Sequence, residues 1–251
     1  MPRNLSGTIA HKDQDGDMPG LRLDTRQPVR LQEKSGTHEN GVLGTGDVGK
    51  AIGKAFVILG HDVKMGSRSA TNEKAVAWVK EMGATASAGT FADAASNGEI
   101  VVLATLGVAN ESALLSAGLE KLRGKVVIDT TNPLDFSGGM PPKLAVAGND
   151  SAGERVQRRL PDAHVVKDFN TVGSAHMIRP GFPGGPPDMF IHGDQEEAKK
   201  IVAGILSDFG WGFADIGGIE SSRYLEAMCL VWVLHGARTN TWNHAFNLLR
   251  R

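Results

Sequence analysis

Three glycines, Gly44, Gly46 and Gly49, follow a short apolar stretch and precede a helix-like segment. Because the 251-residue chain contains 32 glycines, this spacing carries little weight by itself. Its surroundings make it informative, because 41–43 has the pattern of a strand end and 50–55 that of the start of a helix. A strand, a glycine turn and a helix in this order bind the pyrophosphate of a dinucleotide at the helix N-terminus. The sequence therefore predicts dinucleotide binding at this turn.

Short apolar runs alternate with helix-like stretches from Gly41 onward, which is typical of a parallel sheet covered by helices. We expect strands over 41–43, 62–65, 100–105, 126–129 and 164–169. We expect helices between them over 48–59, 73–82, 91–96 and 110–121. The runs 100–104 and 126–128 are continuously apolar, as in strands buried on both faces. The sequence thus predicts an α/β fold with a doubly wound, mostly parallel sheet of the Rossmann type.

The composition and the apolar pattern of the sequence divide the chain into three parts. Residues 1–38 are polar and show no apolar period, so we predict a disordered tail that cannot bury enough surface to offset the entropy of ordering. Residues 39–172 hold the glycine turn and the alternating elements and form the predicted dinucleotide-binding domain. Residues 173–251, which include a loop rich in Gly and Pro at 179–187, are predicted to form a smaller C-terminal α/β and helical domain for substrate binding or dimerisation.

The C-terminal part shows a second, shorter α/β pattern. Its expected elements are a strand over 189–191, a helix over about 195–209, a strand over 211–216 and a long helix from about 219. The stretch from Tyr224 to Leu234 in that last helix is so apolar that it belongs either to the core or to a dimer surface.

The first expected strand is locally inconsistent with a central place in a sheet. Only 41–43 is apolar, and Thr37, His38, Glu39 and Asn40 before it are polar. Either this strand is unusually short, or the residues before Gly41 are not its natural lead-in.

Composition and charge exclude several partners. The formal net charge of −1 gives no electrostatic reason for binding nucleic acid or an anionic membrane. The apolar stretch 227–234 is far shorter than the roughly 20 residues needed to cross a bilayer. The single Cys229 cannot form an intrachain disulfide, and the first 38 residues lack the apolar segment of a secretory signal. We therefore expect a cytoplasmic protein whose partner is a small redox molecule.

The residues after the second expected strand select the cofactor. NAD-binding domains carry an acidic residue there, about 20 positions after the first glycine, which bonds the ribose hydroxyls. This chain has Gly66-Ser67-Arg68 instead. Ser67 can donate a hydrogen bond to a 2′-phosphate and Arg68 can pair with it, while Lys74 on the first turn of the next helix supplies a second cation. The sequence thus predicts NADP(H) as the cofactor.

These motifs and several others resemble those of the F420-dependent NADP reductase family. The likeness includes Gly60-His61-Asp62-Val63, Asp129-Thr130-Thr131-Asn132-Pro133 and Phe169-Asn170-Thr171-Val172, and it continues to the last helices, so it covers about 41–251. The resemblance implies a small protein, usually a homodimer, that passes a hydride between NADPH and the deazaflavin coenzyme F420. The metalloreductase domain of certain membrane ferric reductases is similar in fold and motif.

The resemblance also implies roles for individual residues. The glycine turn would line the pyrophosphate together with Thr45, Asp47 and Val48. The 2′-phosphate would be held by Ser67, Arg68 and Lys74. The cofactor ribose would lie against Thr105, Leu106 and Gly107. This chain has Gly107-Val108 where the F420 reductases commonly carry Pro and an aromatic residue, and Asn170 where archaeal enzymes carry His. We expect F420 or a flavin as the co-substrate.

Three polar residues stand at expected strand ends, where sheets of this type bind ligands: Asn132, Asn170 and Thr171. Hydride transfer between two planar heterocycles needs stacking at about 3 to 3.5 Å and exclusion of water, and it needs no acid or base from the protein. Side chains of this kind can hydrogen-bond a carboxamide or a ring carbonyl. We predict that these residues position the nicotinamide or the acceptor.

Two other functions stay open. An NADP-dependent carbonyl or imine reductase would need a proton donor beside the nicotinamide. However, Tyr224 is followed four residues later by Met228 rather than by lysine, and beyond Lys167 the lysines Lys199 and Lys200 fall on an expected surface helix. A non-catalytic NADP-binding redox sensor would use the same glycine turn. Metal sites and hydrolytic chemistry are not expected, because the chain contains no His-Glu-x-x-His and no Gly-x-Ser-x-Gly sequence.

Overall fold

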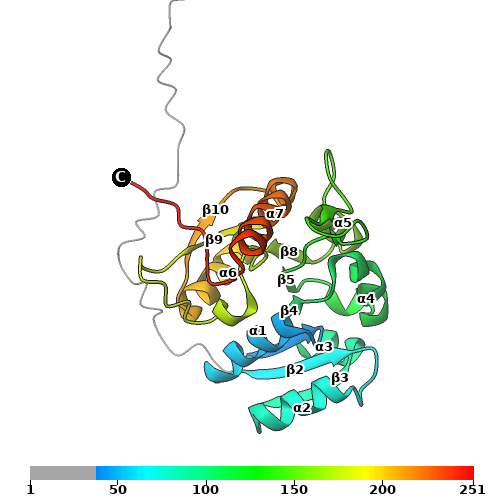
Figure 1. Ribbon diagram of the computed structural model, residues 1–251. Helices are drawn as coiled ribbons and strands as arrows, with labels where there is room; N and C mark the ends of the chain where they lie inside the picture. Colours follow the sequence, from blue (N-terminus) through cyan, green and yellow to red (C-terminus); the bar gives the residue numbers. More distant parts are fainter. Residues whose placement is uncertain (1–37) are drawn as a thin grey trace, which may run out of the picture. The chain divides into compact units, whose positions relative to one another are not determined.

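The structure, a computed structural model, describes residues 38–251. Its centre is a six-stranded sheet of order β3-β2-β1-β4-β5-β8, in which every pair of neighbours is parallel (Figure 1). The strands are β1 (Glu39–Leu43), β2 (Asp62–Ser67), β3 (Ala86–Thr90), β4 (Ile100–Leu103), β5 (Val126–Asp129) and β8 (His164–Lys167). From β1 in the middle of this sheet, the chain winds first to the β3 edge and then to the β8 edge. The predicted doubly wound α/β fold is therefore confirmed.

Helices cover both faces of the sheet. They are α1 (Asp47–Ile58), α2 (Glu73–Met82), α3 (Phe91–Asn97), α4 (Asn110–Ala117), α5 (Ala152–Arg159) and α6 (Glu196–Phe209). Val42 and Ile128 belong to a core shared with α1, α2 and α6. Their neighbours Leu43 and Val127 belong to a second core with α3, α4 and α5. Because successive residues of a strand point to opposite faces, each continuous apolar run builds both cores.

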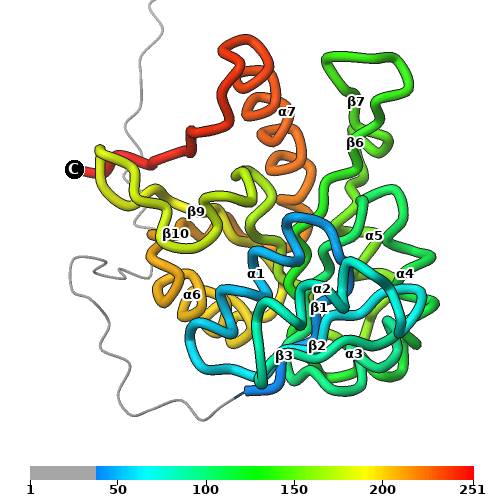
Figure 2. Tube along the Cα trace, turned by 60° about the horizontal axis from the view of Figure 1, so that its bottom comes forward, coloured from blue at the N-terminus to red at the C-terminus, as the bar shows by residue number. Residues whose placement is uncertain are grey.

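The chain after β8 forms a smaller group of elements. Strands β9 (Asp188–Ile191) and β10 (Gly212–Asp215) pair in parallel and are linked by α6, and α7 (Ser222–Thr239) follows. A short hairpin, β6 (Leu134–Asp135) and β7 (Lys143–Leu144), extends on the same side of the molecule as α7 (Figure 2). Single turns of 3₁₀ helix are η1 (Gly107–Ala109), η2 (Leu119–Leu122), η3 (Ser174–His176) and η4 (Ile219–Ser221).

The predicted N-terminal and C-terminal parts share one core. The rings of Phe56 on α1 and Phe209 on α6 lie 5.3 Å apart, and Phe169 after β8 lies 5.7 Å from Phe209. The domain boundary after residue 172 stays a prediction. The predicted tail lies outside the described residues except for His38, whose backbone N–H donates to His61 Nδ1 at 3.2 Å.

One face of helix α7 belongs to the core, and another face of its apolar stretch is exposed. Leu225, Cys229 and Trp232 are buried on one face. Tyr224 and Val231 on another face are 74% and 57% exposed. No helix within residues 38–251 is long and apolar enough to cross a membrane.

The first strand is longer than its apolar residues suggest. It begins at Glu39, and Asn40 is fully buried and pairs with both β2 and β4. The backbone of two neighbouring strands supplies these contacts whatever the side chain, so the strand is not truncated. His38, Glu39 and Asn40 are its lead-in.

Other elements differ from the sequence expectations for local reasons. Strand β3 reads Ala-Ser-Ala-Gly-Thr, too small and polar to show a strand pattern, and half of the residues of α5 are charged, so neither was predicted. The helix expected over 110–121 ends at Ala117, because Gly118 follows with a φ of 83°. Strands β4 and β8 each end two residues earlier than expected, which leaves Ala104-Thr105 and Asp168-Phe169 in loops.

Candidate functional site

The turn between β1 and α1 has the shape of a phosphate cradle. Gly44 has a φ of 138°, and a Cβ there would lie 2.2 Å from the carbonyl oxygen of Ala104. At Gly49 a Cβ would lie 2.4 Å from the carbonyl oxygen of Gly44, so both positions require glycine. Gly46 is exposed, with open space where a side chain would be. No side chain caps α1, so its first amide groups are available to an anion.

The other predicted residues of the turn lie at the mouth of this cradle. Thr45 and Val48 are half-buried and Asp47, in the first turn of α1, is exposed. The arrangement fits a pyrophosphate held by backbone N–H groups.

The loop after β2 presents cations. Ser67 is buried, and its hydroxyl donates to the carbonyl oxygen of Ser69 at 2.6 Å, so its hydrogen is used inside the loop. Arg68 and Lys74 are exposed, and Asn72 caps α2 by accepting from the N–H groups of Lys74 and Ala75. Ser67 therefore shapes the loop, and the charges that suit a 2′-phosphate are those of Arg68 and Lys74.

The loops after β4 and β5 pack directly on each other. A side chain at Gly107 would collide with the backbone of Asn132, whose carbonyl oxygen lies 2.2 Å from the Cβ position. Thr105 is half-buried and Leu106 is 76% exposed. Both loops stand at the carboxyl edge of the sheet, as does the glycine turn, and ligands of doubly wound sheets bind at this edge.

Two of the predicted positioning residues form a pair. Asn170 Nδ2 donates to Asn132 Oδ1 at 2.9 Å, and Asn132 Nδ2 donates to the Asn170 carbonyl oxygen at 2.8 Å. Asn170 Oδ1 is buried and has no hydrogen-bond partner in the part of the chain that the structure describes. This orphaned acceptor fits a donor such as a carboxamide NH2. Thr171 is not part of the pair, because its hydroxyl lies 3.9 Å from Met189 Sδ on β9.

A buried charge cluster lies beneath these loops, and sequence reasoning missed it. Lys167 Nζ lies 2.9 Å from Asp129 Oδ2, 3.1 Å from Glu226 Oε1 and 2.7 Å from the carbonyl oxygen of Thr131. Glu226 also accepts from the backbone N–H groups of Ala152 and Gly153 at the start of α5. All three charged side chains are at most 1% exposed. Burial lowers the pKa of Lys167, but Asp129 and Glu226 outweigh it and raise the pKa, so the lysine is an ammonium ion.

Lys199 is a second buried lysine, contrary to the expectation of a surface position. It pairs with Glu196 and Asp215, each at 2.7 Å, because α6 packs that side chain against β10. Lys200 is exposed as expected.

Asp168, directly after β8, is a buried acid without a counter-ion. Its Oδ1 accepts from the N–H of Phe169 at 2.6 Å, and its Oδ2 has no partner among residues 38–251. Burial raises the pKa of this carboxyl well above its ordinary value, so the folded protein favours the neutral acid.

Replacing Asp168 by asparagine is expected to flatten the pH dependence of stability. The carboxyl ionises near about pH 4 in the unfolded chain but only at higher pH in the fold, so wild-type stability falls by about 1.4 kcal/mol per pH unit between the two values. The Asp168→Asn variant lacks this loss. Its free energy of unfolding relative to wild type should rise with pH, which urea unfolding across this range measures. A difference that stays constant with pH would contradict the neutral acid.

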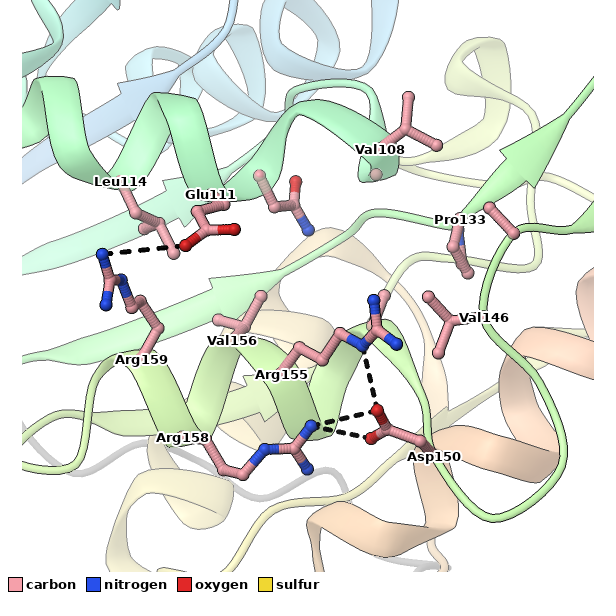
Figure 3. A pocket seen from close by; sticks show the side chains of 14 residues that line it. Val108, Glu111, Leu114, Pro133, Val146, Asp150, Arg155, Val156, Arg158 and Arg159 are labelled. Carbon is pink, nitrogen blue, oxygen red and sulfur yellow. Dashed lines mark hydrogen bonds and ion pairs between the residues drawn. The ribbon is translucent and has the colours of Figure 1, made fainter.

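A cavity lies beside this edge, between α4, α5 and the loop after β7. Its volume is about 710 Å³, and it is lined by apolar side chains such as Val108 and Val156 (Figure 3). Arg155 and Arg158 both hydrogen-bond Asp150 on its wall. Burial raises the pKa of Asp150, but these two arginines outweigh it and lower the pKa to about 2. Gly107 and Pro133 also line the cavity, so it extends to the loops at the carboxyl edge of the sheet. No cluster able to hold a metal ion occurs within residues 38–251.

Comparison with known proteins identifies the family. Residues 39–133 match the family model described as NADP oxidoreductase coenzyme F420-dependent. The F420-dependent NADP reductase of Methanothermobacter marburgensis is 30% identical over 196 residues, which span 73% of this chain and 85% of that protein. The chain belongs to the F420-dependent NADP reductase family. It is thus an NADP-dependent oxidoreductase by family.

Two further proteins are similar to this chain. A solved structure from Arthrobacter sp. FB24, described as a candidate F420-dependent NADP reductase, is 38% identical, covers 86% of this chain and all of its own chain, and has a TM-score of 0.81. Metalloreductase STEAP3 of Rattus norvegicus is 30% identical over 190 residues, 76% of this chain. The chain spans only 36% of the length of that metalloreductase.

Proposed function

We propose that the protein transfers a hydride between NADPH and a deazaflavin or flavin acceptor such as F420. When bound, the nicotinamide supplies the hydride. In this proposal the glycine turn holds the pyrophosphate, Arg68 and Lys74 hold the 2′-phosphate, and Asn170 Oδ1 accepts from the carboxamide. The open helix N-terminus, the exposed cations and the orphaned acceptor described above support these roles.

One observation favours a ring acceptor over a carbonyl or imine. Reduction of those substrates needs a proton donor beside the nicotinamide. Lys167 lies beneath the ends of β4, β5 and β8, but its ammonium has three acceptors within 3.1 Å and no exposed surface. It cannot give a proton to a substrate without breaking a buried ion cluster, and the neutral carboxyl of Asp168, directly after β8, also has no exposed surface. A flavin or deazaflavin ring can take the hydride at the site and its proton from water.

The deciding assay follows NADPH oxidation with F420, FMN, riboflavin, ferric chelates and small cyclic imines and ketones in parallel. We expect turnover with F420 or a flavin. A rate confined to imines or ketones would refute the ring acceptor. Binding of NADPH without oxidation by any acceptor would instead indicate the redox sensor.

We further propose that the cavity beside α5 takes the phosphate-bearing chain of the acceptor. Arg155 and Arg158 offer more donors than Asp150 accepts, so a phosphate can share them. FMN should therefore have a lower KM than riboflavin, which lacks the phosphate. Arg158→Ala should raise the KM for FMN several-fold, by about the worth of one charge-assisted hydrogen bond, and leave riboflavin unchanged. Arg123→Ala, which removes an exposed arginine that does not line this cavity, is the control.

The homodimer implied by the resemblance stays a proposal. The exposed face of α7 around Tyr224 and Val231 is the surface we assign to it. Sedimentation equilibrium of wild type and of Val231→Glu tests it. Equal masses for the two proteins would argue against this surface.

A further inference from the structure

A line of hydrogen bonds connects the buried ion cluster to the loop after β4, at the carboxyl edge of the sheet. Lys167 Nζ lies 2.9 Å from Asp129 Oδ2, and Asp129 Oδ1 lies 2.7 Å from Thr131 Oγ1. Thr131 Oγ1 lies 2.7 Å from Asn110 Nδ2, and Asn110 Oδ1 lies 2.9 Å from Thr105 Oγ1. We call Lys167, Asp129, Thr131, Asn110 and Thr105 the relay. It starts in the core and ends at a half-buried hydroxyl on the loop after β4.

The ion cluster determines which atom donates in each hydrogen bond of the relay. Asp129 faces the ammonium of Lys167, so it is a carboxylate that can only accept. Thr131 must therefore donate its hydroxyl hydrogen to Asp129, and its oxygen is left to accept from Asn110. The NH2 group of Asn110 must then face Thr131, which turns the amide oxygen of Asn110 toward Thr105.

Thr105 stands at the end of the relay. An amide oxygen can only accept, so the hydroxyl of Thr105 must donate its hydrogen to Asn110 Oδ1. What Thr105 presents to the site is a lone pair. Flipping the amide of Asn110 would set its oxygen against the oxygen of Thr131, whose hydroxyl hydrogen is already donated to Asp129, so this buried contact opposes the reversal.

We propose that Thr105 accepts a hydrogen bond from a hydroxyl of the nicotinamide ribose, and that the relay holds it in this accepting state. Thr105 cannot bond a phosphate oxygen, because both atoms would accept. Two kinds of group then bind the cofactor at the carboxyl edge. The N–H groups of the glycine turn donate to the phosphates, and Thr105 accepts from the ribose hydroxyl. Asn110, Thr131 and Asp129 are positioning residues that act through Thr105. This inference rests on the proposed use of NADP(H).

The test compares two ligands by calorimetry. NADPH contains the nicotinamide ribose, whereas adenosine 2′,5′-bisphosphate carries the 2′-phosphate half of the cofactor and lacks that ribose. We expect Thr105→Val to weaken NADPH binding about tenfold, the worth of one hydrogen bond, and to leave the bisphosphate unchanged. Thr105→Ser keeps the hydroxyl and should bind both ligands like wild type.

Two further variants separate the relay from general damage. Thr131→Val cuts the relay two residues away from the cofactor and should weaken NADPH binding about threefold, with no effect on the bisphosphate. Thr130→Val is the matched control. Its hydroxyl is equally buried but donates to the Leu103 carbonyl oxygen outside the relay, so both affinities should stay unchanged.

The outcomes that overturn the inference differ from those that overturn the function. Unchanged NADPH affinity in Thr105→Val would refute the ribose contact. Equal loss of both ligands in Thr105→Val, or the same effect from Thr130→Val as from Thr131→Val, would reduce the relay to a structural role and also refute it. Failure of wild type to bind either ligand would overturn the NADP(H) assignment itself, and the inference with it.

Discussion

Replacing Lys167 by methionine is expected to destabilise the protein by about 3 to 5 kcal/mol, because it leaves two carboxylates buried without a counter-ion. Asp129 and Glu226 are at most 1% exposed and both pair with Lys167 in the folded state. Methionine fills nearly the same volume as lysine, so the decrease in the free energy of unfolding comes from the missing charge and not from a cavity. Urea unfolding followed by tryptophan fluorescence measures it.

Two variants check that explanation. Lys200→Met removes an exposed lysine that pairs with Glu197 on the surface of α6, and it should cost less than about 0.5 kcal/mol. Combining Lys167→Met with Asp129→Asn and Glu226→Gln should recover part of the stability, since the uncompensated charges are then removed as well. A loss below about 1 kcal/mol in Lys167→Met would show that the cluster does not hold the loops together.

Replacing Arg68 by glutamate is expected to weaken NADPH binding about a hundredfold and NADH binding little. A charge-assisted hydrogen bond contributes about 1.5 to 3 kcal/mol, and the new carboxylate adds repulsion of the 2′-phosphate. NADH lacks that phosphate, so only the preference should change. Calorimetric titration with the two nucleotides measures both affinities.

The matched control for Arg68→Glu is Arg123→Glu. Arg123 is also exposed and undergoes the same change of charge, but it precedes β5 and so lies toward the opposite edge of the sheet. It should leave both affinities unchanged. If Arg68→Glu weakens NADH as strongly as NADPH, Arg68 does not hold the 2′-phosphate.

Much of the fold could be predicted because its signals are local. A few consecutive residues are enough to recognise each of three features: the glycine turn, the apolar runs of β4 and β5, and the helices that follow them. Strand β1 was harder, because Asn40 is buried by pairing with strands that arrive 22 and 60 residues later in the chain. Strand β3 is built from small residues and half of α5 is charged, so neither contains the run of large apolar residues that indicates a buried element.

The fold class, the position of the glycine turn and the cationic loop at Arg68 could be predicted from short segments, because backbone conformation and side-chain charge are local properties. Which polar groups are buried together could not be predicted in this way. Lys167 and Asp129 look like ordinary strand ends in the sequence, and Glu226 like a polar residue of an apolar helix. Whether a charge is solvated or paired in the core depends on packing between distant segments. The pairing of Asn132 with Asn170, the inward turn of Thr171 and the accepting state of Thr105 all follow from that packing.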